Sequence, residues 1–212
     1  MIIAVDGPAA SGKGTIARAL AAHYGLPHLD TGLLYRAVGL GVLRSGGDPS
    51  NPAHALSACH YARELLADPA IRSDAAGSAA SMVSAHPDVR AALLDQQRSF
   101  AAQPGGAVLD GRDIGTVIAP EAEAKIFVTA TPEVRADRRH RELAKMGHKT
   151  AYDIVLADIR ARDARDSHRA TAPLRQADDA ILLDTSALTA EASIEEAIRI
   201  VEERRGLKPP SP

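Results

Sequence analysis

The chain has 212 residues, of which 45% are hydrophobic and 25% charged, and its formal net charge is −2. This length allows one domain with excursions, and the balanced charge excludes the global polycation that nucleic acid or an anionic membrane would bind. The single cysteine, Cys59, excludes an internal disulfide and fits a reducing cytoplasm. No stretch approaches the roughly 20 apolar residues of a membrane span, so we expect a cytoplasmic protein without a membrane partner.

The first element is a predicted buried strand, Ile2 to Val5, which leads through a glycine-rich turn into a helix from Lys13 to His23. Backbone N–H groups of such a turn, together with the helix N-terminus, form a concave site for phosphate groups. The lysine would neutralise the β- and γ-phosphates of a nucleotide. The alternative is a glycine-rich strand-to-helix turn without a ligand. The residues of this predicted phosphate loop are Gly7, Pro8, Ala9, Ala10, Ser11, Gly12, Lys13, Gly14 and Thr15.

The loop departs from the strict phosphate-loop pattern, which has Ser or Thr directly after the lysine. Gly14 occupies that position, and Thr15 follows one residue later. This Lys-Gly-Thr form resembles small kinases of nucleoside monophosphates more than switch GTPases. We therefore expect ATP as the bound nucleotide and Thr15 as a contact for Mg²⁺.

The second group of candidate residues follows a weaker strand, Pro27 to Leu29, and opens a helix from Leu33 to Leu43. Thr31 could cap that helix, and Arg36 could face the cleft. The planar guanidinium of an arginine donates two parallel hydrogen bonds to a phosphate, which a lysine cannot do. An ordinary exposed helix arginine is the alternative.

The third group follows the strand Ala107 to Leu109 and reads Asp110-Gly111-Arg112-Asp113. Two carboxylates and a guanidinium at the end of a strand are costly to hold together unless a charged ligand or a metal uses them. A turn whose charges pair with one another is the alternative. Helices are expected before this strand from His54 to Leu66 and from Val89 to Ala101, with loops at 46–52 and 103–106.

The remaining elements continue the alternation of strands and helices that is typical of an α/β fold with a central parallel sheet. Asp30, Asp110 and Thr129 would lie at the carboxyl ends of strands, where open α/β sheets bind ligands. The other predicted elements are strands Ile126 to Val128 and Ala180 to Leu183, helices Pro132 to Lys145, Ala151 to Arg165 and Ile194 to Arg204, and a frayed tail from Lys208 to Pro212.

Arginines are concentrated between residues 133 and 169. Helical spacing puts Arg162, Arg165 and Arg169 on one face, with Asp166 beside them. Several arginines converging on phosphates would suit phosphoryl transfer, which depends on positioning and charge neutralisation, and the segment could close as a lid that excludes water. The alternative is a ladder of surface pairs, because Asp158 and Asp166 each lie four residues from Arg162.

Taken together, the phosphate loop, the segments 30–36 and 110–116, and the arginine-rich run from Arg162 to Leu174 resemble bacterial cytidylate kinase, in the same order and over almost the whole chain. The resemblance implies a single three-layer P-loop domain over 1–212. A helical monophosphate-binding excursion would span about 31–105, and a lid about 132–170. It also implies transfer of the γ-phosphoryl group of ATP to CMP or dCMP with Mg²⁺, giving CDP or dCDP and ADP.

Site residues follow from the resemblance position by position. The catalytic set would be Lys13, Asp110, Arg112 and Arg169, with Asp110 orienting magnesium-bound water. The CMP phosphate would be held by Arg36, Arg112 and Arg169, the cytosine by Ser81, Arg90 and Asp113, and the ribose by Arg162 and Asp166, with Thr31 also at the CMP site. Arg135, Arg138 and Arg139 would belong to the lid, with Arg138 contacting ATP.

The chain departs from the family pattern at two places. The stretch from Arg63 to Ser73 is too short for the β-rich segment that the bacterial family carries there, and Thr31 replaces the common serine. The preference among CMP, dCMP and UMP is therefore left open. Two other functions also stay open, namely a kinase of UMP, dTMP or AMP and an ATP-hydrolysing switch. We expect a monomer whose partners are small molecules.

Overall fold

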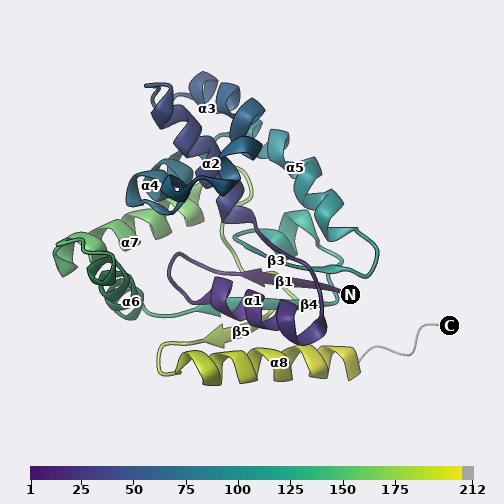
Figure 1. Ribbon diagram of the computed structural model, residues 1–212. Helices are drawn as coiled ribbons and strands as arrows, with labels where there is room; N and C mark the ends of the chain where they lie inside the picture. The colour runs from purple at the N-terminus through teal and green to yellow at the C-terminus, as the bar shows by residue number, and fades with distance from the viewer. Residues whose placement is uncertain (207–212) are drawn as a thin grey trace.

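The computed structural model describes residues 1–206 and shows a five-stranded, entirely parallel sheet in the order β2-β3-β1-β4-β5 (Figure 1). All the predicted strands are confirmed, with ends shifted by one or two residues. The expected tail from Lys208 lies outside the described residues. The strands are β1 (Ile2–Asp6), β2 (His28–Asp30), β3 (Ala107–Gly111), β4 (Ala124–Thr129) and β5 (Ile181–Asp184).

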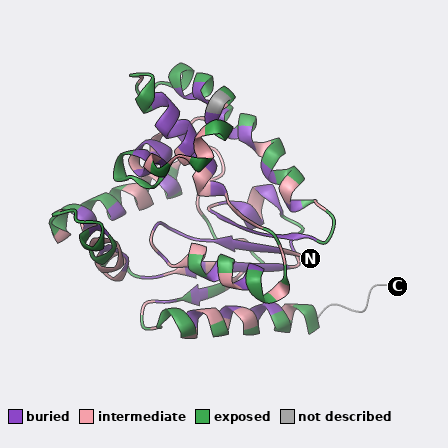
Figure 2. Ribbon diagram, in the orientation of Figure 1, coloured by how far each residue is buried: buried purple, intermediate pink, exposed green. Residues whose placement is uncertain are grey.

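Helices cover both faces of this sheet, which explains why its inner strands are almost continuously apolar. Helices α1 (Lys13–Tyr24) and α8 (Ala190–Gly206) pack on one face against residues of β1 and β4. The π-helix η3 (Ile114–Ile118) and the end of α5 (Pro87–Ala101) cover the other face. The predicted α/β fold with a central parallel sheet is thus confirmed, and its inner strands β1, β3 and β4 are mainly buried (Figure 2). Within residues 1–206, no helix is both long and apolar enough to cross a bilayer.

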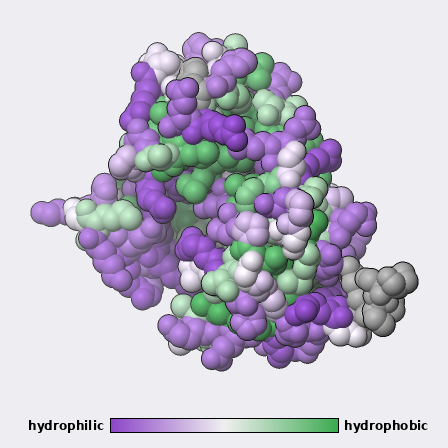
Figure 3. Space-filling model, turned by 45° about the vertical axis from the view of Figure 1, so that its right-hand side comes forward, coloured by the Kyte–Doolittle hydropathy of each residue, from purple (hydrophilic) through white to green (hydrophobic). Residues whose placement is uncertain are grey.

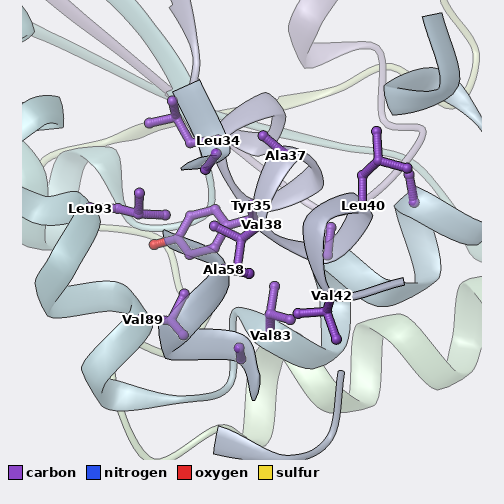
Figure 4. Close-up of a cluster of buried hydrophobic side chains, with 14 of the residues drawn as sticks. Leu34, Tyr35, Ala37, Val38, Leu40, Val42, Ala58, Val83, Val89 and Leu93 are labelled. Carbon is purple, nitrogen blue, oxygen red and sulfur yellow. The ribbon is translucent and has the colours of Figure 1, made fainter. Parts of the chain in front are cut away.

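A helical region stands on the carboxyl edge of the sheet, with its own apolar core. Tyr35 and Val38 of one helix pack there with Val83 and Val89 of two others (Figure 4). Gly39 allows the closest approach, because a Cβ at this position would lie 2.8 Å from Ala79 Cβ. The region comprises α2 (Thr31–Arg44), α3 (Pro52–Ala58), the 3₁₀ helices η1 (Cys59–Ala67) and η2 (Pro69–Arg72), α4 (Asp74–Val83) and α5.

One secondary-structure prediction in this region is wrong, and one helix was missed. The helix expected from His54 to Leu66 is divided between α3 and η1, and α3 begins at Pro52, where the Asn51 side chain accepts hydrogen bonds from the backbone. Helix α4 was not predicted, although its small residues bury one face against α2. The segment 63–73 contains 3₁₀ turns and no strand, so the inferred absence of a β-rich insertion is confirmed.

Two further helices, α6 (Pro132–Lys145) and α7 (Tyr152–His168), form a hairpin beside the helical region (Figure 1). Thr131 caps α6 by accepting a hydrogen bond from Val134 N, as its place before Pro132 suggests. Arg135 joins the two helices through Asp163 and also donates to the carbonyl of Ala9 at 3.2 Å. The hairpin is therefore anchored directly to the loop that follows β1.

Candidate active site

The loop between β1 and α1 has the backbone conformation of a phosphate cradle. Gly7 and Gly12 adopt φ values of +155° and +91°, and Ala10 adopts +58°. A Cβ on Gly7 would lie 2.1 Å from the carbonyl oxygen of Val128, so a larger residue cannot fit without moving β4. Lys13 is the first residue of α1, and its Nζ donates a hydrogen bond to the backbone carbonyl of Pro8 at 3.3 Å. The loop thus combines a helix N-terminus with a lysine, the arrangement that binds phosphate groups.

A cavity of about 720 Å³ lies between this loop, the helical region and the α6–α7 hairpin. In Figure 3, the surface is hollowed between the upper part of the molecule and the projection at the left of the view. The cavity lining does not include the predicted residues Gly7, Pro8, Ser11 and Thr31. The predicted residues that line it are Ala9, Ala10, Gly12, Lys13, Gly14, Thr15, Asp30, Arg36, Ser81, Arg90, Asp110, Arg112, Asp113, Arg138, Arg139, Arg162, Asp166 and Arg169.

The parallel register brings two carboxylates to the cavity beside Lys13. Asp30 and Asp110 are paired at the ends of β2 and β3. Burial and the neighbouring Asp110 raise the pKa of Asp30. Burial, with the nearby Arg112, lowers the pKa of Lys13 to about 8 against the opposite effect of the two carboxylates. His28, which the sequence reasoning missed, lies 2.7 Å from Asp110 Oδ1 and fixes that carboxylate.

The charges of the Asp110-Gly111-Arg112-Asp113 segment do not pair with one another. The alternative interpretation, a turn whose charges pair among themselves, is therefore wrong. Arg112 Nε donates to Asp166 Oδ2 of α7 at 2.7 Å. Asp113 accepts a hydrogen bond from Arg90 Nη2 and lies 3.6 Å from Arg169 Nη2. Each member of the segment therefore holds a partner from a different part of the fold at the cavity.

Two buried guanidinium groups keep donors that make no hydrogen bond with any described residue. These donors are Arg162 Nε and Arg169 Nη2, of which the second lies 3.6 Å from Asp113 Oδ1, beyond hydrogen-bond distance. Burial and the neighbouring Arg112 lower the pKa of Arg162 to about 10. Among the described residues, Arg162 forms neither of the ion pairs with Asp158 and Asp166 that a surface ladder would require. Buried cationic donors that make no hydrogen bond and belong to residues lining a cavity indicate a site for an anion.

Arg36 also reaches this cavity and is not an ordinary exposed helix arginine. Its Nη1 donates to the carbonyls of Ile71 and Ser73 at 3.0 and 3.2 Å. These bonds hold the guanidinium beside the start of α4. They use only Nη1, so the other donors of Arg36 remain available to a ligand.

Three predictions about individual side chains need correction or qualification. Thr31 does not cap α2, because its hydroxyl donates to the carbonyl of Asp110 at 2.8 Å and Asp30 occupies the cap position. Arg135 does not line the cavity, since its donors are used by Ala9, Ala130 and Asp163. Arg138 lines it but donates to Thr185 from both Nη atoms.

Asp6 is a further buried group that the sequence reasoning missed. Its carboxylate accepts from the backbone N–H groups of Ile114 and Gly115, both at 2.8 Å. Burial raises its pKa to about 7 although these two hydrogen bonds oppose the rise. Its position at the end of β1 was the available signal, and the contact fixes the backbone that follows Asp113.

The residues at the loop fit a magnesium ion that is shared with phosphate groups. Thr15 lines the cavity with an exposed hydroxyl that accepts only a 3.4 Å hydrogen bond from Arg18, and the Asp30 and Asp110 carboxylates lie nearby. Within residues 1–206, no cluster of three or more His, Cys, Asp or Glu residues could hold a metal by itself. Magnesium commonly takes one or two protein ligands and completes its shell with phosphate oxygens and water.

Comparison with known proteins identifies the family. The cytidylate kinase family model matches residues 3–203. The cytidylate kinase of Xanthobacter autotrophicus is 64% identical over 206 residues, covering 97% of this chain and 99% of the relative. That of Caulobacter sp. is 59% identical over 208 residues, covering 96% and 95%.

A solved structure of an uncharacterized protein from Eubacterium ventriosum supports the fold. It is 17% identical, covers 96% of this chain and 98% of its own, and has a TM-score of 0.55. The chain belongs to the cytidylate kinase family and is an ATP-dependent nucleoside monophosphate kinase.

Proposed function

We propose that the protein transfers the γ-phosphoryl group of ATP to CMP or dCMP, and that one cavity holds both nucleotides. The main support is the presence of two separate sets of cationic groups in that cavity. Lys13 and the loop amides form one set, and the other comprises Arg36, Arg112, Arg162 and Arg169. A hydrolase or switch needs only the first set, whereas a kinase must also neutralise an acceptor phosphate.

The acceptor phosphate would bind where guanidinium donors without hydrogen bonds meet. Arg162 Nε and Arg169 Nη2 supply such donors, while Asp166 fixes the orientation of Arg112. Burial acts to raise the pKa of Asp166, but the guanidinium groups of Arg112, Arg169 and Arg162 together lower it, so its carboxylate stays ionised and can accept from ribose hydroxyl groups. Asp166 would thus both orient Arg112 and bind the ribose of the acceptor.

The acceptor base would contact Ser81, Arg90 and Asp113, which line the same part of the cavity. Asp113 lies between the guanidinium groups of Arg90 and Arg169, which contact its two carboxylate oxygens. A carboxylate can only accept hydrogen bonds, so it would take them from the exocyclic amine of cytosine. Uracil has a carbonyl oxygen in place of that amine.

Chemistry at this site would depend on alignment and charge neutralisation without a covalent intermediate. Lys13 and the loop amides would hold the donor phosphates, and the acceptor arginines would hold the CMP phosphate opposite them. Mg²⁺, bound through Thr15 and phosphate oxygens, would neutralise charge that develops during transfer. Asp110, fixed by His28, would orient water in that shell.

Two moving parts of one domain would bring the nucleotides together. The helical region, about 31–105, would carry the acceptor, and the segment of about 132–170 would act as a lid. Support comes from the separate core of the helical region and from the cavity that both segments border. Closing would exclude water and so favour transfer over hydrolysis.

We further propose that the protein acts as a monomer in the cytoplasm. Its exposed large apolar residues are Leu43, Leu56, Met146, Ile154 and Leu182, which belong to separate elements, and its one cysteine is free. Size-exclusion chromatography with light scattering should give a mass near 22 kDa. A stable mass of twice that value would contradict the monomer.

Identification of the reaction products tests the proposed activity. Incubation with ATP, Mg²⁺ and CMP should yield CDP and ADP in equal amounts when nucleotides are separated by ion-exchange chromatography. ADP with free phosphate and no CDP would show an ATP-hydrolysing enzyme and would overturn the proposal. UDP formed from UMP in preference to CDP from CMP would assign the acceptor site to another pyrimidine.

A further inference from the structure

Arg165 makes a polar contact between the α6–α7 hairpin and the proposed base site. Its Nε donates to Ser81 Oγ at 3.1 Å, which joins the C-terminal part of α7 to α4. Ser81 is buried, with 6% of its surface exposed, and lines the cavity, whereas Arg165 does not line it. Arg165 therefore reaches the site only through the serine.

The contact determines the hydrogen-bonding role of the serine hydroxyl. A guanidinium has donors and no acceptor, so Ser81 Oγ must accept this bond. The hydroxyl keeps its hydrogen, which no described residue accepts, and one further lone pair. Because the guanidinium draws electron density from the oxygen, this contact strengthens the hydroxyl as a donor and weakens it as an acceptor. The nearby Ser84 hydroxyl donates to the Ser81 backbone carbonyl and leaves the side chain free. Ser81 is thus presented to the cavity as a donor.

The opposite role is fixed in the same way at Asp113. Arg90 and Arg169, which have only donors, approach its two carboxylate oxygens, so Asp113 acts as an acceptor in these contacts. The cavity wall therefore offers one acceptor, Asp113, and one hydroxyl that favours donation, Ser81. A cytosine edge has an amine that donates and a ring nitrogen that accepts, whereas a uracil edge has a carbonyl that accepts and a ring N–H that donates. The pair therefore complements cytosine better than uracil.

We infer that Arg165 is a positioning residue for base selection, which orients the Ser81 hydroxyl so that CMP is favoured over UMP. This inference rests on the proposed function, because it assumes that the base lies against Ser81 and Asp113. It also places selection partly on α7, so the base site is complete only when that helix lies against α4.

The test compares CMP with UMP in variants of the contact. Arg165→Met keeps the length of the side chain and removes its donors, and Arg165→Lys restores one donor. We expect Arg165→Met to lower the ratio of kcat/KM for CMP to that for UMP about 10-fold, the effect of one hydrogen bond of about 1.4 kcal/mol. The KM for ATP should stay within about twofold, and Arg165→Lys should recover part of the ratio. Arg160→Ala is the matched control, because Arg160 lies on the same helix and pairs only with Glu133 at the surface.

A double-mutant cycle separates positioning from general support of the fold. In a Ser81→Ala background, Arg165→Met should have no further effect on the ratio, because the hydroxyl it orients is gone. Ser81→Ala alone should lower the ratio to a similar extent, which gives a test even if Arg165→Met does not fold. Equal losses for CMP and UMP, an unchanged ratio, or additive effects in the cycle would each overturn the inference. A wild-type protein that does not prefer CMP would instead overturn the proposed function.

Discussion

At the scale of single residues, Asp113 is the side chain that best separates base recognition from phosphate binding. Its carboxylate lies between Arg90 and Arg169, and it is buried at the cavity wall. We expect Asp113→Ala to lower kcat/KM for CMP by about 100-fold, since a hydrogen bond to a charged group and the pairing of two cations are both lost. The KM for ATP should remain close to the wild-type value. Steady-state kinetics with CMP and UMP checks this, and equal losses on the two acceptors would argue against base reading by Asp113.

Residue-level prediction from the sequence was possible where the residues of a site are contiguous. The phosphate loop can be recognised because Gly7, Gly12 and Lys13 lie in one short segment between a strand and a helix. Asp6 and His28 were missed because each contacts a residue distant in the chain. The grouping of Arg165 with Arg162 and Arg169 on one phosphate-facing side is wrong, because Arg165 does not line the cavity and donates to Ser81. These contacts have no local sequence pattern, and only the parallel register or the helix packing reveals the pairing.

At the scale of elements, the close contact between α2 and α4 determines where the helix that carries Ser81 lies. Gly39 meets the backbone of Ala79 and Ala80, and a Cβ there would lie 2.9 Å from Ala80 N. We expect Gly39→Ala to lower the free energy of unfolding by about 1–3 kcal/mol, because the two helices must separate. Urea unfolding followed by circular dichroism measures the change.

Gly206→Ala is the control for that substitution, because its Cβ would meet nothing within 4 Å. It should leave stability unchanged or slightly raised, as alanine favours a helix. A Gly39→Ala protein as stable as wild type would show that the α2–α4 contact can relax without cost.

Element prediction was limited where the apolar residues are small. The strands were found because burial on both faces makes them apolar runs. Helix α4 was missed because alanine and glycine form most of its buried face, although the Ser73 cap and Asp74 in its first turn were usable signals. The sequence pattern predicts one α-helix from His54 to Leu66. In the structure, the second half of that segment forms the 3₁₀ helix η1.

At the scale of the whole molecule, Lys13 lowers the stability of the nucleotide-free protein and is expected to stabilise the protein with nucleotide bound. Its pKa is lowered to about 8 in the folded protein from an ordinary 10.5, so between these values the unfolded state binds more protons and stability rises with pH. Near pH 7 the charged lysine is therefore unfavourable in the nucleotide-free fold. We expect Lys13→Met to have a higher Tm than wild type at pH 7, with the difference shrinking by pH 10.

Differential scanning calorimetry in phosphate-free buffer checks this dependence. Added ATP should reverse the order at pH 7, because it stabilises the wild type through the phosphate loop and the variant much less. A wild-type protein that is the more stable of the two at pH 7 without nucleotide would contradict the proposed environment of Lys13.

The central claim is that two cationic sets in one cavity serve phosphoryl transfer between ATP and a cytidine monophosphate. A coupled assay of ADP release tests it most directly, with ATP and Mg²⁺ and with CMP, dCMP, UMP, AMP and dTMP at equal concentrations, beside a Lys13→Ala control. We predict strong turnover with CMP and dCMP, weak or absent turnover with the others, and loss of all turnover in the control. ADP release that is the same with every monophosphate, or without any, would contradict the account.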